Sequence, residues 1–204
     1  MTTITFKARA VGLFYLLMTA AGSIPLLVAH PSQSYAVFAS GLLVVAAYIP
    51  VTVLFYELFE PVSRTVSLTA AFFGLTGCVV QASACLFRIA PLIALTNGQP
   101  AASATLLRAL YRPAYNISLV FFGFYFVLVG VLVFRSTFIP RLLGVLASIA
   151  GLGGLTFLWP PLEPILWPRV ILPLWAGEMI LVLWLLIAGV NVERWRERAH
   201  EAKE

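Results

Sequence analysis

Residues 115–134, YNISLVFFGFYFVLVGVLVF, form an apolar run without a charged side chain. About 20 such residues are what an α-helix needs to cross the hydrocarbon core of a bilayer. Five further segments of this kind lie at approximately residues 10–29, 36–56, 66–87, 142–158 and 171–190. The sequence therefore predicts an all-α polytopic membrane protein, with six transmembrane helices in a compact bundle and one integral membrane domain over residues 1–204.

The overall composition supports this fold class. Hydrophobic residues make up 61% of the 204 residues and charged residues only 10%, whereas soluble domains average about 45–50% apolar and about 25% charged residues. The net charge of +5 comes from basic residues that flank the apolar segments, as is typical of membrane proteins. We therefore expect membrane lipids as partners and no nucleic-acid partner.

The sequence contains no motif for catalysis or for a cofactor. It has no Asp, which excludes aspartyl-phosphate chemistry and hydrolysis by paired Asp residues. Cys78 and Cys85 are separated by about 10.5 Å along a helix, which is beyond the reach of a disulfide. With only two His in the chain, no His/Cys cluster has the spacing of a metal site. We expect neither a metal nor a cofactor.

The distribution of basic residues predicts the orientation. If the N-terminus is cytoplasmic, nine of the thirteen Lys and Arg residues lie on the cytoplasmic side. The four outside are Arg88, Arg108, Arg112 and Arg169. Because short cytoplasmic loops carry an excess of basic residues, we expect both termini in the cytoplasm.

The connection before the fourth span predicts an additional helix. Four of its residues fall along one helical face: Leu106, Leu107, Leu110 and Tyr111. The neighbouring Arg side chains are long enough to reach lipid headgroups. We expect a short helix over about residues 101–112 that lies at the outer surface of the membrane, as an anchor rather than as a lid.

Small and polar residues recur at helical spacing in three of the apolar segments. The three series are Gly74, Cys78, Gln81, Cys85 and Arg88, then Asn116, Gly123 and Gly130, and then Gly144, Ser148 and Gly151. Helices in lipid associate through small residues that allow close approach of the backbones. We interpret the series mainly as packing seams of the bundle.

Polar residues deep in the spans are the candidates for a functional site, because they are costly in hydrocarbon and need partners. Glu178 is the only carboxylate near the middle of a span, and Gln81 lies at a similar depth. Nearer the outer boundary are Arg88, Tyr111, Tyr115, Asn116 and His30. Glu178 is the catalytic candidate, and the other six are candidates for binding a ligand in one outward-facing cavity. An equally favoured alternative is a structural network in which Glu178 is protonated or hydrogen-bonded to Gln81 or Asn116; in both cases Glu178 is expected to face the bundle interior.

Several stretches resemble one protein family. They are residues 116–125 (NISLVFFGFY), 134–146 (FRSTFIPRLLGVL), 8–17 (ARAVGLFYLL), 177–178 (GE) and 184–191 (WLLIAGVN). Together they are similar to the bacterial domain of unknown function 4386 family over nearly the whole chain. Related proteins often carry a His shortly before the fourth helix, where this chain has Tyr111, so a role that needs this His does not transfer. The resemblance implies a multi-pass protein of the bacterial cytoplasmic (inner) membrane and brings no activity with it.

Three functions remain open from the sequence. The first is binding of a lipid or another apolar small molecule, or service as an accessory subunit. The second is an intramembrane enzyme that acts on a lipid or isoprenoid, with Glu178 as acid or base and Arg88 holding an anionic headgroup. The third is a small proton-linked transporter, in which Pro25 and Pro50 would kink the first two helices. We favour them in this order, with the presence of any enzymatic activity and the oligomeric state left open.

The orientation is tested by labelling single cysteines in intact cells with a membrane-impermeant thiol reagent. Cysteines placed near Pro100 and Glu163 should be labelled, and a cysteine near Arg198 should be labelled only after lysis. The opposite pattern would show that both termini lie outside the cytoplasm and that the predicted orientation is wrong.

Overall fold

The fold is a bundle of long helices, seen in a computed structural model that describes residues 3–27, 34–166, 169 and 171–202. The helices are α1 (Thr3–Leu27), α2 (Ser34–Phe59), α3 (Arg64–Thr96), α4 (Ala101–Arg135), α5 (Arg141–Leu155), α6 (Glu163–Leu166), α7 (Ile171–Ile187) and α8 (Val192–Glu201). Two 3-10 turns, Thr156–Leu158 and Pro160–Leu162, join α5 to α6. The described part of the chain contains no strand, so the all-α prediction is confirmed.

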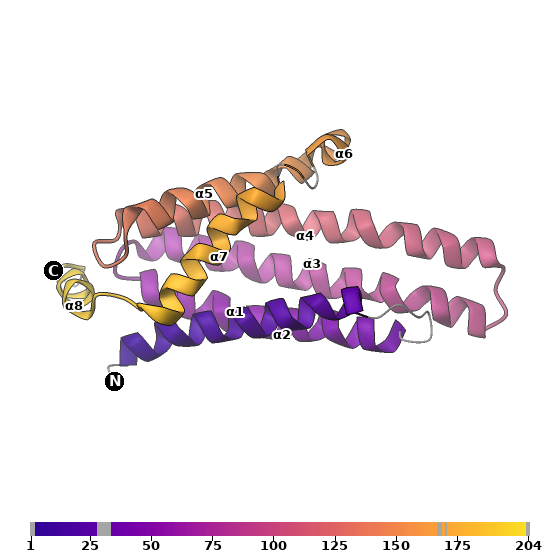
Figure 1. The fold of residues 1–204 in the computed structure, drawn as a ribbon, viewed down its shortest axis with the longest axis horizontal. Coiled ribbons are helices and arrows are strands. Elements are labelled where there is room, and N and C mark those ends of the chain that lie inside the picture. The colour runs from indigo at the N-terminus through magenta and orange to yellow at the C-terminus, as the bar shows by residue number, and fades with distance from the viewer. Residues whose placement is uncertain (1–2, 28–33, 167–168, 170, 203–204) are drawn as a thin grey trace.

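The helices α1 to α4, and α5 together with the 3-10 turn Thr156–Leu158, are long and apolar enough to cross a membrane. α7 has 17 residues, and it provides a sixth span when it is taken together with α8, from which it is bent by 102°. The first five helices run up and down side by side, and α7 lies diagonally across α1 and α5 (Figure 1). Both ends of the described chain lie at the same end of the bundle (Figure 1).

α7 ends earlier than the predicted span, which extended to residue 190. Its last turn is closed by Gly189, which has a φ of +70° and donates its N–H to the carbonyl of Trp184. A residue without Cβ is favoured in this left-handed conformation. Asn191 then caps the start of α8 by accepting from the N–H of Arg194 at 3.1 Å. These two local signals explain the bend.

The predicted division between a surface helix and the fourth span is wrong. α4 starts at Ala101, as the surface helix should, but it continues through Pro113 to Arg135 as one helix of 35 residues. At 1.5 Å per residue it is about 52 Å long, which exceeds the roughly 30 Å hydrocarbon core. α3 runs antiparallel beside it (Figure 1), so packing against α3 stabilises the helix on both sides of the proline. The hairpin of α3 and α4 therefore extends beyond the span predicted for it.

Glycines of α4 and α5 bring the two backbones into contact. A Cβ placed on Gly144 would lie 2.5 Å from the Phe134 nitrogen and 2.6 Å from the Gly130 carbonyl oxygen. A Cβ on Gly151 would lie 2.7 Å from the Gly123 carbonyl oxygen. The small-residue series on α4 and the one on α5 thus face each other, as expected of a packing seam in lipid.

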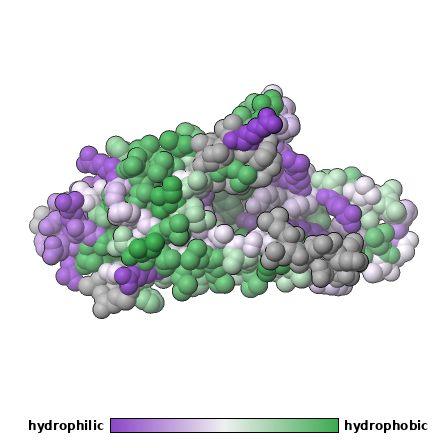
Figure 2. Space-filling model, in the orientation of Figure 1, coloured by the Kyte–Doolittle hydropathy of each residue, from purple (hydrophilic) through white to green (hydrophobic). Residues whose placement is uncertain are grey.

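Aromatic residues fill the core on the other side of α4. The rings of Tyr48 and Phe122 are 4.4 Å apart between centroids, and Tyr125 packs edge-on against Phe55 at 6.3 Å. Outside this core, the middle of the visible surface is largely hydrophobic, and hydrophilic residues gather at the end where α8 lies (Figure 2). Exposed apolar side chains over the middle of the bundle are what a lipid-facing surface requires.

α8 closes the end of the bundle that holds both termini. The Trp195 indole N–H donates to the Leu58 carbonyl at 2.9 Å, and Lys7 pairs with Glu57 at 2.9 Å. These contacts tie α8, α2 and α1 together where the charged residues of the chain concentrate.

The helix seam predicts a large difference between two glycine substitutions. Gly144→Ala should lower the free energy of unfolding by about 1–3 kcal/mol, because the methyl group would meet backbone atoms that cannot move independently. Gly22→Ala is the matched control, since a Cβ there meets only a Val44 methyl at an ordinary 3.7 Å. Thermal unfolding in detergent measures both. Equal tolerance of the two substitutions would mean that α4 and α5 do not touch at Gly144.

Candidate ligand-binding cavity

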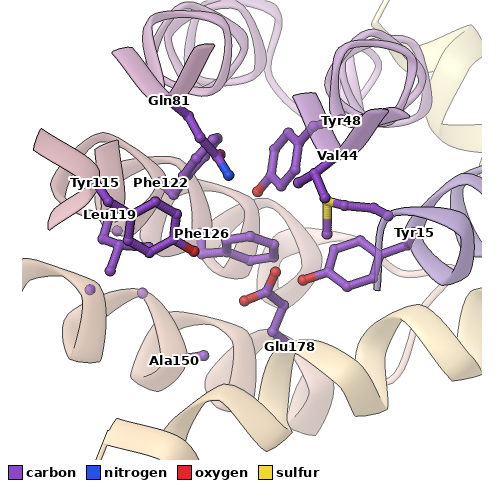
Figure 3. Close-up of a pocket in the computed structure, with 14 residues that line it drawn as sticks. Tyr15, Val44, Tyr48, Gln81, Tyr115, Leu119, Phe122, Phe126, Ala150 and Glu178 are labelled. Carbon is purple, nitrogen blue, oxygen red and sulfur yellow. The ribbon is translucent and has the colours of Figure 1, made fainter. Parts of the chain in front are cut away.

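A cavity of about 160 Å³ lies inside the bundle. Each of α1, α2, α3, α4, α5 and α7 contributes to its wall, as Figure 3 shows for the labelled side chains. The lining residues are Tyr15, Met18, Val44, Tyr48, Gln81, Tyr115, Leu119, Phe122, Gly123, Phe126, Ala150, Gly151, Gly154 and Glu178. Most of the wall is thus aromatic or aliphatic, with one carboxylate, one amide and three phenol groups.

Glu178 points into this cavity from α7 (Figure 3). This placement agrees with the expectation that it faces the interior, since a carboxylate near the middle of a lipid-exposed helix costs about 2.5–3.5 kcal/mol. Its position follows from Gly177, where a Cβ would lie 2.6 Å from the Leu146 carbonyl oxygen. The absence of a side chain at residue 177 lets α7 approach α5 closely, and the next residue then enters the cavity.

The Glu178 carboxylate has no hydrogen bond or ion pair to any residue that the structure describes. The hydroxyls of Tyr15, Tyr48 and Tyr115 point toward the same space (Figure 3). The Tyr48 hydroxyl is itself buried without a hydrogen-bond partner. Buried polar groups are normally paired. The cavity therefore contains hydrogen-bonding groups that could pair with a ligand.

The predicted hydrogen bonds from Glu178 to Gln81 or Asn116 are not formed. Gln81 is buried and lines the cavity from α3, but no bond joins its amide to Glu178. Asn116 donates from Nδ2 to Oε2 of Glu163 at 2.8 Å instead. The interpretation of Glu178 as a member of a satisfied structural network therefore finds no support in the described contacts.

Glu163 is a polar residue whose contacts the sequence pattern did not indicate. Its side chain is only 15% exposed, and its second oxygen accepts from the Arg112 Nε at 2.6 Å. The pair of bonds ties the α5–α7 connection to α4. One signal for this contact was present in the sequence: Asn116 is a polar residue at the start of an apolar run and has no evident partner nearby. Its partner, Glu163, is 47 residues away in sequence.

Arg88 and Tyr111 form a second polar group beside the cavity. The Arg88 guanidinium donates to the Tyr111 hydroxyl, and its carbon lies 4.4 Å from the centroid of the Tyr111 ring. Tyr111 stacks on Tyr115 at 5.8 Å, and Tyr115 lines the cavity. Arg88 is thus connected to the cavity wall through two rings without being part of the wall.

The structure brings together three of the seven candidate residues, namely Glu178, Gln81 and Tyr115. Arg88 and Tyr111 lie behind Tyr115, Asn116 belongs to the Glu163 pair, and His30 lies outside the described residues. Tyr15 and Tyr48 also line the cavity, and the sequence pattern did not indicate them, because a tyrosine within an apolar run carries no sign of the face on which it lies. Over the described ranges, no group of three or more His, Cys, Asp or Glu residues could hold a metal ion.

The contacts of Glu163 predict a measurable coupling with Asn116. A double-mutant cycle with Asn116→Ala and Glu163→Ala should give a coupling energy of about 1.5–3 kcal/mol, because the bond involves a charged and largely buried acceptor. The same cycle for Arg198 and Glu201, an exposed pair at 2.8 Å, should give less than about 1 kcal/mol. Chemical unfolding in mild detergent supplies the values, and a coupling near zero for Asn116 and Glu163 would contradict the pairing.

Comparison with known proteins identifies the family and no activity. An uncharacterized protein of Archaeoglobus fulgidus is 26% identical over 149 residues, which cover 72% of this chain and 80% of that protein. No solved structure matches the chain. The family model described as "Domain of unknown function (DUF4386)" matches residues 10–189. Because this match covers most of the sequence, the chain belongs to the DUF4386 family.

Proposed function

We propose that this membrane protein binds an amphipathic small molecule, such as a lipid, in the cavity beside Glu178. The observation that carries the proposal is a carboxylate without a partner among the described residues, placed in a cavity with a mostly apolar wall. Ligand pockets typically combine such a wall with a few polar groups that fix the orientation of the ligand. A cavity maintained for packing alone would be filled or would be lined by apolar groups only.

The size of the cavity limits what it can hold. A volume of about 160 Å³ is close to that of engineered cavities of about 150 Å³ that bind benzene. Pockets for whole drug-sized ligands are larger, at about 300–1,000 Å³. We therefore propose that the cavity receives the polar end or a short segment of the ligand, and that the remainder extends between helices toward the lipid.

Binding explains the lining better than catalysis does. The wall contains one carboxylate and no His, Lys or Cys among the residues that line it. Acid–base catalysis on a lipid would need a second acid or base near the reacting atoms, and the three tyrosine hydroxyls of the wall suit this role less well than a His, a Lys or a second carboxylate. We therefore rank the enzyme hypothesis second, after binding. Proton-linked transport, which would also use Glu178, ranks third. An accessory role without a ligand leaves the unpaired carboxylate unexplained.

We further propose that the protein is a multi-pass protein of the bacterial inner membrane with both termini in the cytoplasm. The excess of basic residues at one end of the helices supports this orientation. The position of both ends of the described chain at the same end of the bundle is consistent with it (Figure 1).

The binding proposal is tested by native mass spectrometry of protein purified in mild detergent. The wild type should retain a small molecule, and Val44→Trp should lose it, because Val44 lines the cavity and an indole ring would occupy much of its volume. Val53→Trp is the control on the same helix, since Val53 is 43% exposed and lies outside the cavity wall. Loss in the first variant and retention in the second is the expected result.

Two outcomes would contradict binding in this cavity. One is retention of the same molecule by Val44→Trp, which would place the molecule elsewhere on the protein. The other is the absence of any adduct from the wild type, both in detergent and in nanodiscs formed directly from the native membrane.

A further inference from the structure

We infer that the cavity binds an alkylammonium group, with the Glu178 carboxylate as its counter-ion and the rings of Tyr15, Tyr48 and Phe122 around it. This inference rests on the proposed binding function and names the chemical class of the ligand. It combines the charge of the one carboxylate in the wall with the arrangement of the rings that surround it.

The Glu178 carboxyl group can pair with a cation. A carboxylate shielded from water is stable as an ion only when it is paired and hydrogen-bonded. Within the ranges that the structure describes, no Lys or Arg pairs with Glu178. The Arg88 guanidinium is engaged by Tyr111: it lies over the Tyr111 ring and donates a hydrogen bond to the Tyr111 hydroxyl. A positively charged group on the ligand would supply the missing partner.

The rings offer a surface that attracts the same kind of group. Tyr48 lies 4.4 Å from Phe122 at an interplanar angle of 41° and 6.5 Å from Tyr15 at 49°. These rings come from α1, α2 and α4; Tyr48 and Phe122 pack directly against each other, and all three rings line the cavity, so a ligand would lie beside the rings and not between Tyr48 and Phe122. Aromatic side chains that line a cavity attract quaternary ammonium groups, because each ring face carries negative electrostatic potential.

Other ligand ends fit the cavity less well. A phosphate or carboxylate would face Glu178 with a charge of the same sign. A neutral alcohol or ketone would pair with the carboxyl group only in its protonated form, and it would not use the negative potential of the ring faces. A trimethylammonium group is compact and apolar on its outside, so it suits both the aromatic wall and the volume of about 160 Å³.

The test uses choline and its neutral isostere 3,3-dimethylbutan-1-ol, in which carbon replaces the ammonium nitrogen. Binding to the protein in dodecyl maltoside is measured by isothermal titration calorimetry. Choline should bind at least tenfold more tightly than the isostere. Soluble dihexanoyl phosphatidylcholine, used below its critical micelle concentration, forms the lipid arm. Tighter binding of this lipid than of choline would identify a lipid headgroup as the source of the ammonium, and the reverse order would identify a free amine.

Variants assign the binding to this cavity. Glu178→Gln should weaken choline binding at least tenfold and leave binding of the neutral isostere unchanged. Glu57→Gln is the control, because Glu57 pairs with Lys7 at the end of the bundle. Tyr48→Leu should weaken choline binding severalfold while Tyr48→Phe preserves it, which supplies a second measurement should Glu178→Gln fold poorly.

The outcomes separate this inference from the function on which it rests. Equal binding of choline and the isostere, with no effect of Glu178→Gln, would overturn the ammonium assignment and leave binding of an apolar molecule standing. Absence of binding by choline, the isostere and the lipid would overturn the ammonium assignment, and an absent adduct in mass spectrometry would overturn the binding function as well.

Discussion

The close approach of α4 and α5 determines where the rest of the bundle lies. Gly130 and Gly144 let these two backbones touch, and the surface of α5 then receives α7 at Gly177. At its other end α7 meets α1, where a Cβ on Gly12 would lie 2.6 Å from the Cβ of Leu186. In lipid there is no hydrophobic effect to bring helices together, so such backbone contacts supply the packing energy. The same contacts direct Glu178 inward.

The position of Glu178 inside the bundle keeps its carboxyl group out of the lipid but leaves it without a hydrogen-bond partner among the described residues. The side chain avoids the lipid, where it would cost about 2.5–3.5 kcal/mol, but it enters a cavity without a partner among the described residues. The packing seams could be built equally well with an apolar residue at this position. Natural membrane proteins keep ionisable groups at depth mainly where they act on ions, protons or ligands. The glycines of the packing seams therefore stabilise the fold, whereas Glu178 gives the cavity its carboxyl group.

The sequence was sufficient to predict the fold class, because length and hydropathy alone distinguish a membrane span from a soluble helix. It also indicated the faces of α4 and α5 that meet, since small residues at helical spacing have one main use in lipid. It failed at α4, where four residues on one helical face and two neighbouring Arg residues suggested a separate surface helix over residues 101–112. Packing against α3 maintains one continuous helix there, and no local pattern reports such packing.

The candidate site was only partly predictable for a similar reason. Glu178 and Gln81 stand out in apolar runs because each is polar at depth. Tyr15 and Tyr48 do not stand out, since tyrosine also serves as an ordinary core residue. The Glu163 pair depends on a contact between α4 and the connection after α5, which requires knowledge of how the helices neighbour one another. Residues that act through distant contacts become visible only in the folded chain.

The most direct test of this account is the stability of ligand-free Glu178→Leu. If Glu178 serves the ligand and not the fold, the free energy of unfolding should stay equal to that of the wild type or rise, because no protein group loses a partner and a buried charge is removed. A decrease of about 1–3 kcal/mol, restored by Glu178→Gln, would show that Glu178 satisfies protein groups through hydrogen bonds. That result would contradict the central claim.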